Sequence, residues 1–228
     1  DGAAPVVGTG VARVQYLPLM TERTPLSLSL VDALAPWAAA LLGGPVLPLR
    51  AKGMRYHGAT TWHRDADGPF ASLGCAAYLE PLSGRNGALR VLPGSHTGTF
   101  ADDAAAWFAG GGKGVDDVAG VVVDTVPRDV IVFDEHLFHA SGGGGQRHQW
   151  RVDYVRDPDD DAAADALRAW CAPVFDVAWD GGYDADRYPS YPPLSSSSRP
   201  WAARLAALGV VDLAAAQEAA MRARRARR

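Results

Sequence analysis

The chain has 228 residues, of which 48% are hydrophobic and 21% are charged, a composition typical of one globular domain. Its formal net charge of -4 gives no general reason to expect a nucleic-acid partner. No run of about eighteen apolar residues occurs and the first residues lack a signal-peptide pattern, so no membrane partner is expected. The two cysteines lack metal-ligand spacing and indicate reduced thiols in a cytoplasmic protein. The protein is expected to be either a monomer or a homodimer.

Short strand-like runs and turn signals dominate the first two thirds of the chain. A strand is expected over 11–16 and a helix over 30–42, where Pro36 is tolerable only near the first helical turn. Further strands are expected over 46–56, 71–79, 88–92, 120–126, 130–133 and 150–155. Turn signals such as Asp67-Gly68-Pro69 separate them, and many short strands of this kind favour a β-sandwich or barrel.

Helical patterns lie mostly in the last third of the chain. A short helix is expected over 102–109, and a glycine-rich loop follows it over 110–114. An alanine-rich helix is expected to begin near residue 159, before an aperiodic Tyr/Pro/Ser stretch. Two closing helices are expected over 200–208 and 212–224, and the basic end MRARRARR is interpreted as a solvated tail.

The stretch TTWHRDADGPF places a histidine and an aspartate two positions apart, at what reads as the end of a strand. Residues two apart on a strand point to the same face, so His63 and Asp65 would lie side by side. A non-haem Fe(II) site needs two imidazoles and one carboxylate on one side of the metal. His63 and Asp65 would supply two of these ligands, although a His-x-Asp triplet by itself also occurs by chance.

The third ligand must come from elsewhere, and the segment RDVIVFDEHLFHASGGGGQRHQWRVDYV contains three further histidines. Together with WHRD and the segment LEPLSGRNGALRVLPGSH, this region resembles the phytanoyl-CoA dioxygenase family of Fe(II)/2-oxoglutarate oxygenases, from about residue 52 to residue 154. In that family a histidine is followed by a small residue, Ser and Gly, and His139-Ala140-Ser141-Gly142 fits this pattern.

The resemblance implies a mainly β fold, a double-stranded β-helix (jelly-roll) core with flanking helices, whose metal ligands are His63, Asp65 and His139. His136 lies three residues before His139, would face the other way on a strand, and is interpreted as a non-ligand. The other histidines, His57, His96 and His148, are also interpreted as non-ligands. The predicted organisation is one domain over 1–228, with a β core over about 46–156 and a helical or lid region over about 157–228.

The resemblance also implies that a strand-borne arginine binds the far carboxylate of 2-oxoglutarate, with Ser141 adding a hydrogen bond. The family usually places this arginine eleven residues beyond the distal histidine. Arg151 lies twelve beyond His139 and is preferred because it falls in a strand-like run. Arg147 lies eight beyond and is the alternative, expected to fall in the glycine-rich turn.

Other cations and aromatic residues near these motifs are candidates for binding. Lys52 is a further candidate for the cosubstrate, while Arg55 and Trp62 are candidates for the substrate. The loop over 110–114 and the aromatic stretch over 179–191 are expected to form a lid over the barrel, since loops on a rigid scaffold commonly carry specificity.

The implied activity is that of a dioxygenase that uses Fe(II), 2-oxoglutarate and dioxygen to hydroxylate a C–H bond of a small metabolite, in bacterial natural-product biosynthesis. Desaturation, epimerisation or cyclisation would use the same iron. Halogenation is not expected, because halogenases of this superfamily have Gly or Ala where Asp65 stands. Two other classes stay open: a non-catalytic jelly-roll binding module, and a cupin-type metalloenzyme that needs no 2-oxoglutarate.

Overall fold

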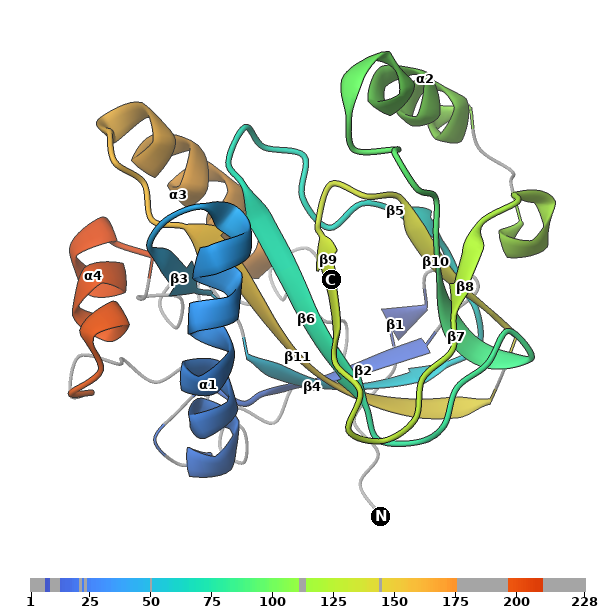
Figure 1. Cartoon of the computed structure of the whole chain (residues 1–228), viewed down its shortest axis with the longest axis horizontal. Coiled ribbons are helices and arrows are strands. Elements are labelled where there is room, and N and C mark those ends of the chain that lie inside the picture. The colour runs from blue at the N-terminus through green and yellow to red at the C-terminus, as the bar shows by residue number, and fades with distance from the viewer. Residues whose placement is uncertain are drawn as a thin grey trace, which may run out of the picture.

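The structure is a computed structural model, and two antiparallel β-sheets form its core (Figure 1). It describes residues 7–8, 13–20, 22, 24–49, 51–110, 114–143, 145–175 and 197–210. The larger sheet has the order β1 (Val7–Gly8), β2 (Arg13–Pro18), β4 (Lys52–His57), β11 (Gln146–Arg156), β6 (Ser72–Tyr78) and β9 (Ile131–Asp134), and β3 (Val46–Pro48) also pairs with β11. The smaller sheet has the order β5 (Thr60–His63), β10 (His139–Gly143), β7 (Asn86–Val91) and β8 (Val121–Val123).

The strands from β4 to β11 follow a jelly-roll path. Strands β4, β6, β9 and β11 lie in the larger sheet, whereas β5, β7, β8 and β10 lie in the smaller one. Apart from β7 and β8, consecutive strands therefore lie in different sheets, which is the interleaving of a double-stranded β-helix. The predicted fold class is confirmed.

Strand β11 separates the helical layer from the space between the sheets. Its residues Trp150, Val152 and Tyr154 belong to an apolar cluster shared with helices α1 (Pro25–Leu42), α3 (Asp161–Phe175) and α4 (Pro200–Leu208). These helices lie together at one end of the larger sheet in Figure 1. Because side chains alternate along a strand, the intervening residues face the interior of the jelly roll. These are Arg147, Gln149, Arg151 and Asp153, and all are buried.

Helix α1 begins earlier than the sequence indicates and continues through Pro36. The expectation that Pro36 lies near the first turn is wrong. Burial of Leu28, Val31 and Ala38 offsets the cost of about 3 kcal/mol that an internal proline imposes. By length and composition α1 is also the one described helix that could cross a bilayer, although Leu28 and Val31 lie in the core.

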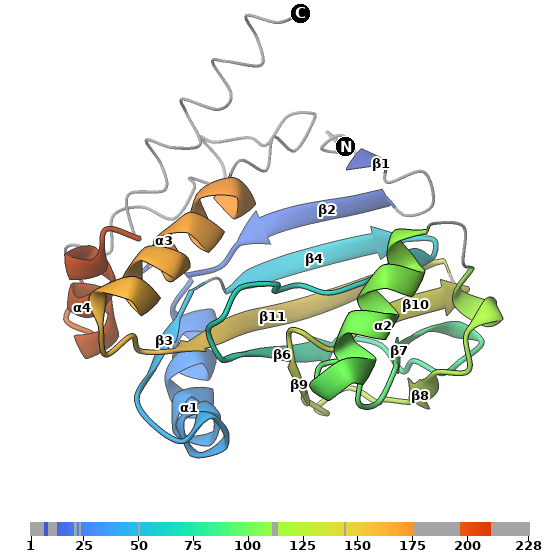
Figure 2. The same ribbon diagram turned by 90° about the horizontal axis from the view of Figure 1, so that it is seen from above.

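Other element boundaries differ from the sequence-based expectations in two places that matter for the site. The strand expected over 46–56 is divided into β3 and β4. Strand β11 begins at Gln146 and pairs with β4 from that residue on, so Arg147 is part of a strand and its expected place in a turn is wrong. Helix α2 (Gly98–Ala109) and the short 3-10 helix η1 (Val115–Asp117) accompany the smaller sheet, and α2 crosses in front of it in Figure 2.

Several expected features fall on residues that the structure does not describe. The helix over 212–224, the aromatic stretch over 179–191 and most of the loop over 110–114 lie outside the described residues. The expected lid and the division into a β core and a helical region remain predictions.

Candidate metal centre

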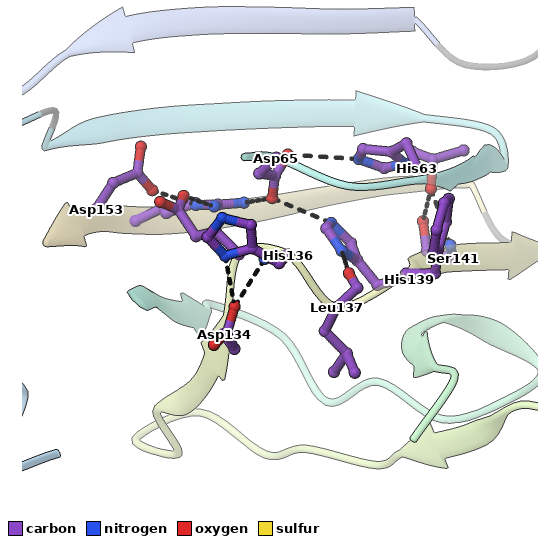
Figure 3. Close-up of polar contacts among 12 residues, drawn as sticks. His63, Asp65, Asp134, His136, Leu137, His139, Ser141 and Asp153 are labelled. Atoms are coloured by element: carbon purple, nitrogen blue, oxygen red, sulfur yellow. Dashed lines mark hydrogen bonds and ion pairs between the residues drawn. The ribbon is translucent and has the colours of Figure 1, made fainter. Parts of the chain in front are cut away.

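The expected ligands converge at the end of the smaller sheet (Figure 3). Strand β5 ends at His63, and β10 begins at His139, which pairs with His63 across the two antiparallel strands. Asp65 follows two residues after His63, where its backbone N–H donates to the carbonyl of Glu135 at 2.9 Å. Ligand atoms of His63, Asp65 and His139 all lie within 4.8 Å of one another.

Both imidazoles direct Nε2 at the Asp65 carboxylate. His63 Nε2 lies 3.6 Å from Asp65 Oδ1, and His139 Nε2 lies 3.1 Å from Oδ2. Each Nδ1 faces a backbone carbonyl, that of Thr61 at 2.7 Å and that of Leu137 at 2.9 Å. Because a carbonyl only accepts, each Nδ1 carries a hydrogen, so Nε2 is the nitrogen of each ring that is placed to bind a metal ion.

The protonation states suit a cation. Partial burial lowers the pKa of His63, whose side chain is 42% exposed, and the neighbouring His139 lowers it further. Burial by itself raises the pKa of Asp65, but Arg151 and His139 outweigh it and hold that pKa well below its ordinary value. Asp65 Oδ2 is buried and has no aligned hydrogen bond. Two imidazole nitrogens and a carboxylate oxygen within 4.8 Å of one another are donors that divalent metal ions take in proteins, so these residues fit such an ion.

The remaining histidines lie outside this cluster. His136 contacts Asp134 Oδ1 through Nδ1 at 2.9 Å and the Gly68 carbonyl through Nε2 at 2.8 Å. It therefore joins the loop after Asp65 to the turn before His139. His57 and His96 are exposed, and His148 contacts Glu80. The cluster that brings two histidines together with Asp65 contains none of these four.

Arg151 lies beside the candidate ligands and is surrounded by carboxylates. Its Nη1 is 2.7 Å from Asp65 Oδ2, its Nη2 is 2.7 Å from Glu135 Oε1, and its Nε is 2.6 Å from Asp153 Oδ1. Lys52 Nζ contacts the other oxygen of Asp153 at 2.5 Å. Arg151 and Lys52 are both buried, and their charges are matched by side chains of the protein.

Arg147 occupies a different part of the interior, near the start of β11. It is 1% exposed, its Nη1 donates to the Gly58 carbonyl at 2.7 Å, and its Nη2 donates to Ser141 Oγ. Its guanidinium lies over the Tyr56 ring, 4.8 Å from the centroid. Its Nε is buried without a hydrogen-bond partner. Ser141 follows His139 by two residues on β10, so Arg147 contacts the strand that carries this candidate ligand.

The two residues expected to contact substrate lie elsewhere. Trp62 precedes His63 and packs with Phe108 of α2 and with Phe138, in a cluster on the side of the sheet away from the candidate ligands. Arg55 is exposed on β4. Neither placement supports a role in the interior, and strand alternation would have indicated this for Trp62.

The sequence reasoning did not identify Glu135, Asp153 and Tyr56, all of which belong to the interior. Asp153 and Arg151 are two residues apart on one strand, so alternation could have indicated their common face. Glu135 carries no comparable signal, because the turn after β9 places it and no local pattern predicts that turn.

Comparison with known proteins gives one family and several structures. The profile of the phytanoyl-CoA dioxygenase (PhyH) family matches residues 31–151, more than half of the chain. No curated protein matches the chain.

Among solved structures, EvdMO1 is 28% identical over 55% of this chain and 30% of its own length, with a TM-score of 0.45. The 2-oxoglutarate-dependent epimerase SnoN from nogalamycin biosynthesis is 18% identical over 68% of this chain and 66% of its own, with a TM-score of 0.53. HygX from Streptomyces hygroscopicus, with nickel and 2-oxoglutarate bound, is 18% identical over 63% of this chain and 70% of its own, with a TM-score of 0.52. The chain thus spans less than two thirds of EvdMO1 and of SnoN. The likeness to SnoN and HygX supports the jelly-roll fold.

Proposed function

Because the chain belongs to the phytanoyl-CoA dioxygenase (PhyH) family, we propose that it is an Fe(II)- and 2-oxoglutarate-dependent dioxygenase with His63, Asp65 and His139 as metal ligands. The observation that carries this proposal is that Nε2 of His63 and Nε2 of His139 both face the Asp65 carboxylate, at 3.6 and 3.1 Å. Bound Fe(II), with 2-oxoglutarate and dioxygen, would supply oxidation of an unactivated C–H bond. Two neutral imidazoles and one carboxylate leave metal positions open for these reactants.

Arg147, rather than Arg151, is the residue proposed to bind the far carboxylate of 2-oxoglutarate. Arg151 already has a carboxylate oxygen within 2.7 Å of each of its three nitrogens. Arg147 has a buried Nε without a partner, and the oxygens that its other nitrogens contact, among them those of Gly58 and Ser141, are neutral. A buried guanidinium in neutral surroundings favours an anionic ligand, and its planar fork matches a carboxylate. Ser141 stays in this proposal as a donor to the same carboxylate.

The charges around the site are consistent with a metal and a dianion that bind together. The cations Lys52, Arg147 and Arg151 equal in number the carboxylates Asp65, Glu135 and Asp153. A divalent cation and doubly charged 2-oxoglutarate would leave this balance unchanged. Binding either one alone would leave a net charge in a low-dielectric interior, which is costly. Each ligand is therefore expected to raise the affinity for the other.

Substrate is proposed to enter from the His63 side. The His63 side chain is 42% exposed, whereas that of His139 is 4% exposed, so the candidate centre opens on the side of β5. We propose a small metabolite of natural-product biosynthesis as substrate, and hydroxylation as the outcome. Epimerisation is the second candidate outcome, favoured by the structural likeness to the epimerase SnoN.

The test is an anaerobic titration of the metal-free protein with Fe(II) and 2-oxoglutarate, followed by visible absorption. The weak charge-transfer band of an iron–2-oxoglutarate chelate is expected in the wild type and is expected to be absent in His139→Ala. Metal binding without the band would favour a cupin-type metalloenzyme, and no binding at all would favour a binding module. Succinate release would then be used to screen substrates. Analysis of the product would separate hydroxylation from epimerisation.

A further inference from the structure

The guanidinium of Arg151 is the centre of a buried charge network that reaches a candidate metal ligand. Three carboxylates surround it, those of Asp65, Glu135 and Asp153, and Lys52 contacts Asp153 from the far side. The Arg151 side chain is 7% exposed, while those of Glu135 and Asp153 are fully buried. Removing charged groups from water costs free energy that close pairing only offsets. A contribution to stability therefore does not by itself account for this network.

The fold assembles this network from four separate strands and turns. Arg151 and Asp153 alternate on β11, and Lys52 pairs with Arg151 in the β4–β11 ladder. Gly74 on β6 leaves room for the guanidinium, because a Cβ there would lie 2.8 Å from Arg151 Nη2. The ring of Phe133, which pairs with Gly74 across β6 and β9, has its centroid 5.1 Å from Arg151 Cζ. The space is thus fitted to an arginine whose position is fixed by its surroundings.

The contact between Arg151 and Asp65 acts on the ligand that is least restrained by secondary structure. His63 and His139 belong to paired strands, whereas Asp65 follows the end of β5 and is held through its backbone by Glu135. The same residue, Glu135, contacts Arg151 through its side chain. Arg151 therefore determines where the Asp65 carboxylate lies relative to the two imidazoles.

We propose that Arg151 is a positioning residue of the metal centre: held by Glu135 and Asp153, it fixes the Asp65 carboxylate for metal binding without touching the metal. This inference rests on the proposed function, since it concerns the same ligands. Partners that orient a ligand typically change metal affinity by about 10–100-fold when they are removed. Lys52 supports Arg151 indirectly by sharing the charge of Asp153.

The experiment measures Co(II) binding to the full chain, with Co(II) as a metal probe that needs no anaerobic handling. Wild type, Arg151→Gln, Arg151→Lys and the control Arg55→Gln are titrated, and the visible d–d bands of Co(II) are recorded. Arg55 is a matched control because it is an exposed arginine on the same sheet. Circular dichroism and thermal unfolding check the fold of each variant.

Arg151→Gln is expected to raise the Kd for Co(II) by about 10–100-fold and to change the d–d bands. Arg151→Lys is expected to recover part of the affinity, because it keeps the charge but cannot contact three carboxylates at once. If the Gln variant does not fold, the Lys variant carries the test, with a weaker Kd expected at wild-type thermal stability. Arg55→Gln is expected to bind like the wild type.

Three results would overturn the inference, and they can be told apart. Wild-type Co(II) affinity in both Arg151 variants would show that Arg151 does not position Asp65. Unchanged Co(II) affinity with lost 2-oxoglutarate affinity would make Arg151 an anion-binding residue instead. No Co(II) binding by the wild type would reject the proposed metal centre itself, and with it this inference.

Discussion

The assignment of the cosubstrate carboxylate to Arg147 makes a prediction that the structure allows to be quantified. Arg147→Leu removes the guanidinium of a residue that is 1% exposed and leaves a shorter, apolar side chain. Hydrogen bonds to charged groups contribute about 1.5–3 kcal/mol each, so a two-bond fork to a carboxylate contributes at least about 3 kcal/mol. At 1.4 kcal/mol per tenfold, the Kd for 2-oxoglutarate is expected to rise by at least about 100-fold.

The assay is isothermal titration of 2-oxoglutarate into protein saturated with Co(II), so that differences in metal affinity do not enter. Arg147→Lys is expected to lie between wild type and Arg147→Leu, since it keeps the charge but loses the planar fork. Arg55→Leu, on the neighbouring strand and exposed, is the control and is expected to bind normally. The reasoning is refuted if Arg147→Leu binds 2-oxoglutarate within a few-fold of the wild type while Arg151→Lys does not.

Three further predictions follow from the same contacts. His139→Ala is expected to lose Co(II) binding and turnover while keeping its circular dichroism spectrum, and metal-dependent turnover in this variant would contradict the ligand assignment. Gly74→Ala is expected to lower the free energy of unfolding by about 1–3 kcal/mol, because its Cβ would lie 2.8 Å from Arg151 Nη2; urea denaturation with an unchanged midpoint would show that the guanidinium can move aside. His136 faces a carboxylate and a carbonyl, which only accept, so its protonated form is preferred, and the hydrogen bond that it donates to Asp134 raises the pKa of His136. Its stabilising effect is therefore full below the unfolded pKa of about 6.5 and lost as pH rises through the folded value, so the stability difference between wild type and His136→Gln is expected to be larger at pH 5.5 than at pH 8.5; a difference independent of pH would contradict it.

The sequence predicted the elements whose patterns are local. His63 and Asp65 are two residues apart on an extended segment, and no long-range information is needed to place them on one face. The family resemblance then brought in His139, which the pairing of β5 with β10 places opposite His63. The chain path between these strands could not be read from periodicity, because strands that alternate between two sheets carry the same two-residue repeat whichever sheet they join.

The expected placement of Arg147 in a turn shows where propensity arguments stop. Four glycines from Gly142 to Gly145 indicate a turn, because glycine is depleted in strands, and that reasoning placed Arg147 outside the sheet. In the structure β10 runs through Gly143, and β11 begins at Gln146. Pairing with β5 and β7 on either side stabilises β10 regardless of its glycines, and the left-handed φ of 71° at Gly143 is one that glycine adopts without strain. Arg147 is then the first inward-facing position of β11 and Arg151 the third, so one strand carries both the arginine beside Ser141 and the arginine beside Asp65. Because side chains alternate along a strand, two arginines four residues apart face the same interior, and only the start of β11 at Gln146 brings Arg147 into that pattern.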